Sequence, residues 1–169
     1  MLQRIKLRNT LLVGAVTVLA SCGGQKKVKM GSYAYDAQFL KENGIEYTEL
    51  VSADGNSKVM IIPAWQGRVM TTSASGDEGD SYGWINYRFI REGKISPQFN
   101  PVGGEERFWL GPEGGPFSLY FKQGQEQVYD NWVVPTVLDT EAFTIKSQDK
   151  SSIHFAKATR LTNASGTVF

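Results

Sequence analysis

The sequence predicts a mainly β domain, a β-sandwich with one or two short helices. Three observations support this fold class. Glycine and aromatic residues are abundant, with 18 glycines and 12% aromatics among 169 residues; long helical periods are rare; and short apolar runs alternate with turn residues. Many short strands with regular turns favour a sandwich over an open sheet.

A short helix is the first expected element of the domain, over Tyr33–Asn43. Its apolar side chains recur on neighbouring turns, and Asn43-Gly44 is a typical helix stop. Three strands follow, at Tyr47–Ser52, Lys58–Pro63 and Arg68–Ser73. The Asp54-Gly55 turn makes the first two of these strands the first hairpin of the chain.

The second half of the chain begins with a polar loop over residues 74–81. Asn86 can cap a brief helix that runs through Arg91, and Gly93 is placed to end it. Further strands are expected at Arg107–Leu110, Pro116–Phe121, Phe143–Ser147, Ile153–Ala158 and Arg160–Thr162, with a hairpin turn at residues 148–150. Because the apolar pair Val168-Phe169 resembles the opening of another strand, we expect a larger domain that continues beyond this sequence.

The N-terminus has the layout of a secretory signal peptide, with a basic start and an apolar run over Leu11–Leu19. Leu19-Ala20-Ser21-Cys22 resembles the bacterial lipobox, which predicts a signal peptide over residues 1–21 and a lipidated Cys22 that anchors the protein to a membrane. An uncleaved membrane anchor is the alternative, but the apolar run has only about ten residues where a spanning helix needs roughly twenty. The expected organisation is therefore a lipidated tether over residues 22–32 and a β-sandwich domain over 33–169.

Composition narrows the partners of the mature chain. Without the leader, 15 basic residues stand against 17 acidic ones, so the net charge is near −2 and no nucleic-acid partner is expected. With the single cysteine lipidated, the domain has no thiol for a disulfide or a metal site. No spacing of ligating residues predicts a metal, and no cofactor is expected.

The densest chemistry lies between Gly103 and Gly115. Glycine pairs flank a segment that carries three glutamates, an arginine and a tryptophan, and glycine lets a ligand or another chain approach closely. An aromatic face with carboxylate and guanidinium groups suits a sugar ring. The candidate ligand-binding residues are Glu105, Glu106, Arg107, Trp109, Glu113 and Trp84. The alternative is that Phe108 and Trp109 belong to the core and that Arg107 pairs with Glu105 or Glu106.

Four segments of the chain carry a resemblance to a known family: Gly103–Gly115, Trp65–Met70, Tyr82–Asn86 and Leu161–Asn163. The mature chain resembles an uncharacterised family of Bacteroides-type lipoproteins that is described only as a domain of unknown function. The order of elements also resembles the N-terminal part of the galactose-mutarotase supersandwich. That resemblance implies a sugar site, and an epimerase would need a glutamate base and a histidine acid. The single histidine, His154, is expected on the solvent face of its strand.

Three functions remain open at this stage. The first is a lipid-anchored envelope protein that binds a glycan, the second a mutarotase or epimerase-like enzyme, and the third a non-catalytic envelope scaffold. Gly23 replaces the aspartate of inner-membrane retention signals, and basic residues follow it. We therefore expect the outer membrane, with the protein facing the periplasm. Most of the four tryptophans are expected in the core, and either Trp84 or Trp109 is expected to be the exposed one.

Overall fold

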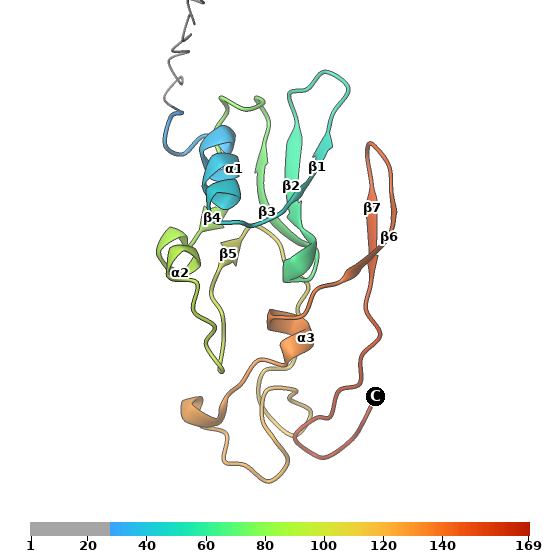
Figure 1. The fold of residues 1–169 in the computed structure, drawn as a ribbon. Coiled ribbons are helices and arrows are strands. Elements are labelled where there is room, and N and C mark those ends of the chain that lie inside the picture. Colours follow the sequence, from blue (N-terminus) through green and yellow to red (C-terminus); the bar gives the residue numbers. More distant parts are fainter. Residues whose placement is uncertain (1–27) are drawn as a thin grey trace, which may run out of the picture.

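The computed structural model of this protein describes residues 28–169. A three-stranded antiparallel sheet, in the order β1-β2-β3, lies in the upper half of the molecule in Figure 1. Its strands are β1 (Thr48–Val51), β2 (Lys58–Ile62) and β3 (Arg68–Ser73). All three lie where the sequence predicts them, because short runs of apolar and β-branched residues between turn residues favour extended backbone.

The pairing of β2 with β3 contains a β-bulge. Met60 faces Thr71 while Ile61 faces Val69, so Met70 is an extra residue in β3. Bulges re-aim side chains on the strand that carries them. Here both Met70 and Thr71 are fully buried, Met70 within the main apolar core.

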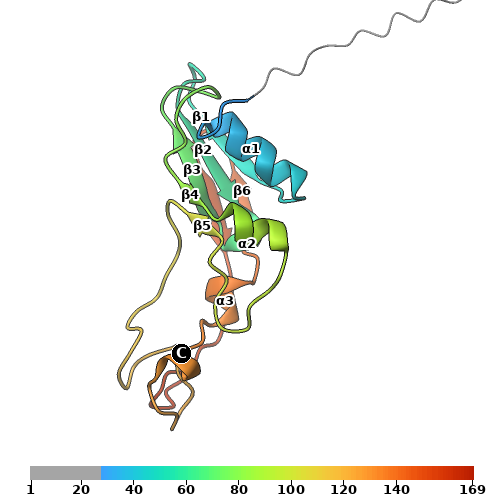
Figure 2. The same cartoon turned by 90° about the vertical axis from the view of Figure 1, so that its left-hand side faces the viewer.

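Two helices cover one face of this sheet, as Figure 2 shows. α1 (Tyr33–Glu42) begins at Ser32, whose hydroxyl accepts a hydrogen bond from the backbone of Tyr35, and α2 (Tyr87–Glu92) begins at Asn86 and ends at Gly93. Both predicted helices are confirmed, and so are the capping roles of Asn86 and Gly93. The core under the helices contains Tyr33, Phe39, Leu40, Met60, Ile62, Met70, Ile85, Ile90 and Val102.

Two smaller antiparallel sheets complete the strands of the described residues. The strand β4 (Trp84–Ile85) pairs with β5 (Gly103–Gly104), and β6 (Thr144–Gln148) pairs with β7 (Ile153–Ala156). The hairpin of β6 and β7 was predicted, whereas the short β4–β5 pair was not. A short helix, α3 (Thr136–Asp139), was also not predicted.

The lower half of the molecule in Figure 1 consists mostly of loops, with α3 and one short 3-10 turn among them, and here three strand predictions are wrong. Neither Arg107–Leu110 nor Pro116–Phe121 forms a strand, and Arg160–Thr162 contributes only one isolated bridge, between Thr162 and Val168. Within residues 28–169, no strand pairs with the first two segments, and in the third Leu161 exchanges two backbone hydrogen bonds with Phe169. Their apolar side chains instead build a second core around Leu119, Tyr120, Phe121, Val134, Val137 and Leu138.

The structure is therefore mainly small antiparallel sheets with three α-helices among residues 28–169. A sandwich requires two sheets packed face to face, and that finer prediction stays open. Within the same residues, no helix is long and apolar enough to cross a bilayer. The predicted signal peptide and Cys22 lie outside the described residues.

Candidate functional site

Trp84 stands on the exposed side of β4. Its side chain is 62% exposed, while that of its neighbour Ile85 is buried in the core. Side chains alternate along a strand, so Trp84 lies on the face of the sheet that the helices do not cover. Tyr82, two residues earlier, is 61% exposed. Trp84 or Trp109 was expected to be exposed, and Trp84 is the exposed one, since Trp109 is half-buried.

The glycine pair of β5 brings the chain close to β4 and β3. A Cβ atom at Gly103 would lie 2.2 Å from the carbonyl oxygen of Trp84, and one at Gly104 would lie 2.7 Å from the Cδ atom of Arg68. Both glycines also have positive φ, of 96° and 119°. The expected reason for this glycine pair, close backbone approach, is confirmed.

Glu105 follows β5 and lies beside β3. Its backbone nitrogen donates to the carbonyl oxygen of Val69 at 2.9 Å, and its Oε1 atom accepts a hydrogen bond from the Thr72 hydroxyl at 3.0 Å. The backbone nitrogen of Tyr82 donates to the carbonyl oxygen of the same Thr72 at 3.1 Å. Half-buried Thr72 thus contacts both Glu105 and Tyr82, and Trp84 follows Tyr82 by two residues. We call Thr72, Tyr82, Trp84 and Glu105 together the Trp84 surface. Glu106 is exposed next to it.

Arg107 turns away from both glutamates. Its guanidinium donates to the carbonyl oxygen of Leu138 and lies 4.1 Å from the centroid of the Trp109 ring. The Nε atom is buried without a hydrogen-bond partner. Burial lowers the pKa of Arg107 below its usual value, and the carboxylate of Asp139 partly offsets this. The alternative in which Arg107 pairs with Glu105 or Glu106 is wrong; its polar partner is a backbone carbonyl on α3.

Trp109 and Glu113 belong to an aromatic cluster in the lower core. The indole Nε1 of Trp109 donates to Oε1 of Glu113 at 2.8 Å, and its ring packs 5.3 Å from that of Tyr120. Tyr120 stacks in turn on Trp132, with centroids 5.6 Å apart. Burial raises the pKa of Tyr120 to about 12, and Glu113 adds to the shift. The contacts of Trp109 agree with the packing alternative, whereas Glu113 remains exposed at the rim of the cluster.

The six predicted ligand-binding residues are thus divided between two places. Trp84 and Glu105 share the exposed surface beside β3, with Glu106 next to it, while Arg107, Trp109 and Glu113 surround the lower core. His154 is exposed on β7, with half-buried neighbours on either side, as predicted. No group of three or more His, Cys, Asp or Glu side chains within residues 28–169 could hold a metal ion.

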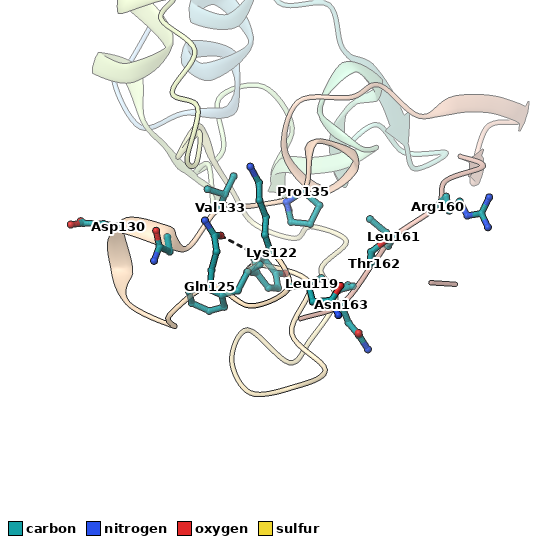
Figure 3. Close-up of a pocket in the computed structure, with 14 residues that line it drawn as sticks. Leu119, Lys122, Gln125, Asp130, Val133, Pro135, Arg160, Leu161, Thr162 and Asn163 are labelled. Atoms are coloured by element: carbon teal, nitrogen blue, oxygen red, sulfur yellow. Dashed lines mark hydrogen bonds between the residues drawn. The ribbon is translucent and has the colours of Figure 1, made fainter. Parts of the chain in front are cut away.

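A pocket of about 440 Å³ in the lower half was not predicted (Figure 3). Three segments distant in sequence line it: residues 119–125, 130–135 and 160–163. The backbone nitrogen of Val133 donates to the carbonyl oxygen of Tyr120 at 2.9 Å, and that of Leu161 to the carbonyl oxygen of Phe169 at 2.9 Å. No local motif marks such a site, because each segment supplies only a few of the lining side chains.

Residues 31–169 match a family described as "Family of unknown function (DUF6786)". No curated protein and no solved structure matched the chain.

Proposed function

The chain belongs to this family of unknown function, and we propose that it is a lipid-anchored cell-envelope protein that binds carbohydrate. The family description assigns no activity, so the proposal rests on the Trp84 surface and on the N-terminal leader. The observation that carries the carbohydrate part is the exposure of two aromatic rings, those of Tyr82 and Trp84. Thr72, which accepts from the backbone of Tyr82, also donates to the carboxylate of Glu105. The anchor part rests on the sequence around Cys22, which lies outside the described residues.

Aromatic exposure of this kind suits the apolar face of a sugar ring. Large aromatic side chains are usually found in cores or at binding sites, because leaving their rings in water forgoes the free energy of burial. Trp84 and Tyr82 are each more than half exposed. A pyranose stacked on Trp84 would cover its ring while leaving the sugar hydroxyls at the edge for hydrogen bonds.

Glu105 supplies an acceptor for those hydroxyls. Only its Oε1 atom takes a hydrogen bond, from Thr72, among the described residues. The Thr72 bond fixes the carboxylate beside β3, so that Oε2 can accept from a sugar hydroxyl without a large entropy loss. An ordered carboxylate beside an aromatic ring is a combination that sugar sites use.

The envelope location is supported by the leader. A basic start, a short apolar run and Leu19-Ala20-Ser21-Cys22 together favour cleavage before Cys22 and its acylation. More than one acyl chain makes such an anchor effectively permanent. The resemblance to Bacteroides-type lipoproteins and to a galactose-mutarotase-like supersandwich agrees with an outer-membrane protein that faces the periplasm and binds sugar.

A binding experiment with variants tests the carbohydrate part. The full-length protein in detergent is screened against a broad glycan panel, and bound glycans are titrated by intrinsic fluorescence. We expect Trp84→Ala to abolish detectable binding and Glu105→Ala to weaken it. Phe117→Ala is the matched control, because Phe117 is an exposed aromatic residue outside the Trp84 surface.

Two results would contradict the proposal. One is a wild-type protein that binds no glycan in the panel. The other is a bound glycan whose affinity Trp84→Ala leaves unchanged, with all variants melting like the wild type; this result would favour a role of the Trp84 surface in scaffolding.

A further inference from the structure

The pocket in Figure 3 is a second candidate site, separate from the Trp84 surface. Its volume of about 440 Å³ falls within the range of small-molecule sites. We propose that it binds a compact sugar acid, a six-carbon hydroxy acid of the uronic type, whose carboxylate pairs with Lys122. This inference rests on the pocket alone and does not require carbohydrate at the Trp84 surface.

An apolar base lines the pocket. The lining contains Leu119, Phe121, Val133, Pro135 and Leu161. Leu119 and Phe121 are almost fully buried, so their side chains also belong to the lower core and hold the base in place. A base of this kind suits the C–H face of a sugar ring and gives no advantage to a purely ionic ligand.

Lys122 provides the charge at the pocket. In Figure 3 its side chain rises between Gln125 and Pro135, whereas Asp130 and Arg160 stand at opposite ends and point outward. Lys122 forms no ion pair with any residue in the described part of the chain, and the same holds for Asp130. Exposed Lys122 therefore has no carboxylate partner among the described residues, and an anionic ligand in the pocket would supply one.

Amide groups at the rim supply the remaining polar contacts. Gln125 accepts a hydrogen bond from the backbone nitrogen of Lys122 at 3.3 Å through Oε1, which leaves its NH₂ group as a donor. Asn131 donates from Nδ2 to the carbonyl oxygen of Glu126 at 2.9 Å, which leaves its Oδ1 as an acceptor. Thr162, which adds a hydroxyl to the lining, stands beside Leu161 on the other side of Figure 3 from Gln125. One donor, one acceptor and one hydroxyl match the hydroxyl groups of a sugar acid.

The test compares an acidic sugar with its neutral counterpart. The full-length protein in detergent is titrated with sodium glucuronate and with glucose by isothermal calorimetry, and Trp132 fluorescence gives a second reading because Trp132 adjoins Val133 and stacks on Tyr120. We expect saturable binding of glucuronate and binding of glucose weaker by about tenfold, the value of a hydrogen-bonded charge. Higher salt should weaken glucuronate binding, since the pair is partly exposed.

Variants separate the pocket from the rest of the surface. Lys122→Met should reduce glucuronate affinity about tenfold. Lys122→Arg retains the positive charge and should therefore keep most of the glucuronate affinity. Lys146→Met is the matched control, since Lys146 is an exposed lysine on β6. Trp84→Ala should leave glucuronate binding unchanged. The result at the pocket is therefore independent of whether the Trp84 surface binds a glycan.

Three outcomes would overturn the inference. These are the absence of saturable glucuronate binding, equal affinity for glucose and glucuronate, and equal loss of affinity in Lys122→Met and Lys146→Met. Thermal melting of every variant is measured alongside, and Lys122→Arg distinguishes a lost charge from a damaged fold.

Discussion

Replacing Asp36 tests how the Trp84 surface is held in place. The carboxylate of Asp36 is almost fully buried and accepts hydrogen bonds from the hydroxyls of Ser81 on the β3–β4 connection and Tyr87 on α2. Ser81 immediately precedes Tyr82, so this carboxylate joins α1 to the segment that carries the exposed aromatic residues.

The expected loss of stability in Asp36→Ala follows from the hydroxyl donors that lose their acceptor. Ser81 keeps a hydroxyl partner, because the Oγ1 atom of Thr71 lies 2.5 Å from its Oγ. Tyr87 loses the only side-chain hydrogen bond that its hydroxyl forms in the described part of the chain. Two bonds to a charged acceptor contribute about 1.5–3 kcal/mol each, and the retained Ser81–Thr71 contact recovers part of this. We expect a loss of about 3 kcal/mol in the free energy of unfolding.

Urea unfolding followed by circular dichroism measures this loss by linear extrapolation. Tyr87→Phe should cost about 1.5 kcal/mol alone, and the double variant should cost less than the sum because both changes remove the same bond. A loss below about 0.5 kcal/mol for Asp36→Ala, or strict additivity with Tyr87→Phe, would refute the reasoning.

Three further predictions concern pH, glycine geometry and the anchor. Burial raises the pKa of Tyr120 to about 12, so between pH 10 and 12 the folded state keeps a proton that the unfolded chain loses. The contribution of Tyr120 to stability should therefore be complete below pH 10 and fall between pH 10 and 12. Urea unfolding at alkaline pH in which Tyr120→Phe shows the same fall as the wild type would contradict this. Gly104→Ala should cost about 2 kcal/mol, because φ is +119° and the new Cβ would lie 2.7 Å from the Cδ atom of Arg68. The control Gly114→Ala, which meets only the Gln127 Oε1 atom at 3.7 Å, should stay within about 0.5 kcal/mol; equal thermal melting of both variants would refute the steric argument. Cys22→Ser should move the protein from the membrane to the soluble fraction on sedimentation, and its retention with membranes would refute lipid anchoring.

The elements that the sequence predicted correctly depend on neighbours in the chain. Asn86 caps α2 through its own side chain, and Gly93 ends that helix in the left-handed conformation. The Asp54 carboxylate accepts from Ser52 and Asn56 within the first hairpin turn. Such contacts span five residues or fewer, so residue type and spacing are enough to find them.

The strand predictions failed where tertiary contacts decide the backbone. The segment 116–121 has the apolar content of a strand, yet it forms no ladder with a neighbouring strand. Its carbonyl groups accept separate backbone hydrogen bonds, from Val133 to Tyr120, from Ala164 to Ser118 and from Ser165 to Pro116. Strand propensity reflects how well a side chain packs on a pleated surface, and it does not supply the neighbouring strand. In this protein the same aromatic residues fill a core made of loops instead.

The candidate site shows the same division. The sequence by itself determined the capped helices, the first hairpin and the group of charged and aromatic residues between Gly103 and Gly115, because local spacing carries each of these patterns. The lipobox leader stays a prediction. Only the tertiary structure separated Glu105 from Glu113, turned Arg107 toward Leu138, 31 residues away, and brought three distant segments together around the pocket. The reason is that desolvation and packing act between residues that meet in space, and these partners depend on the path of the whole chain.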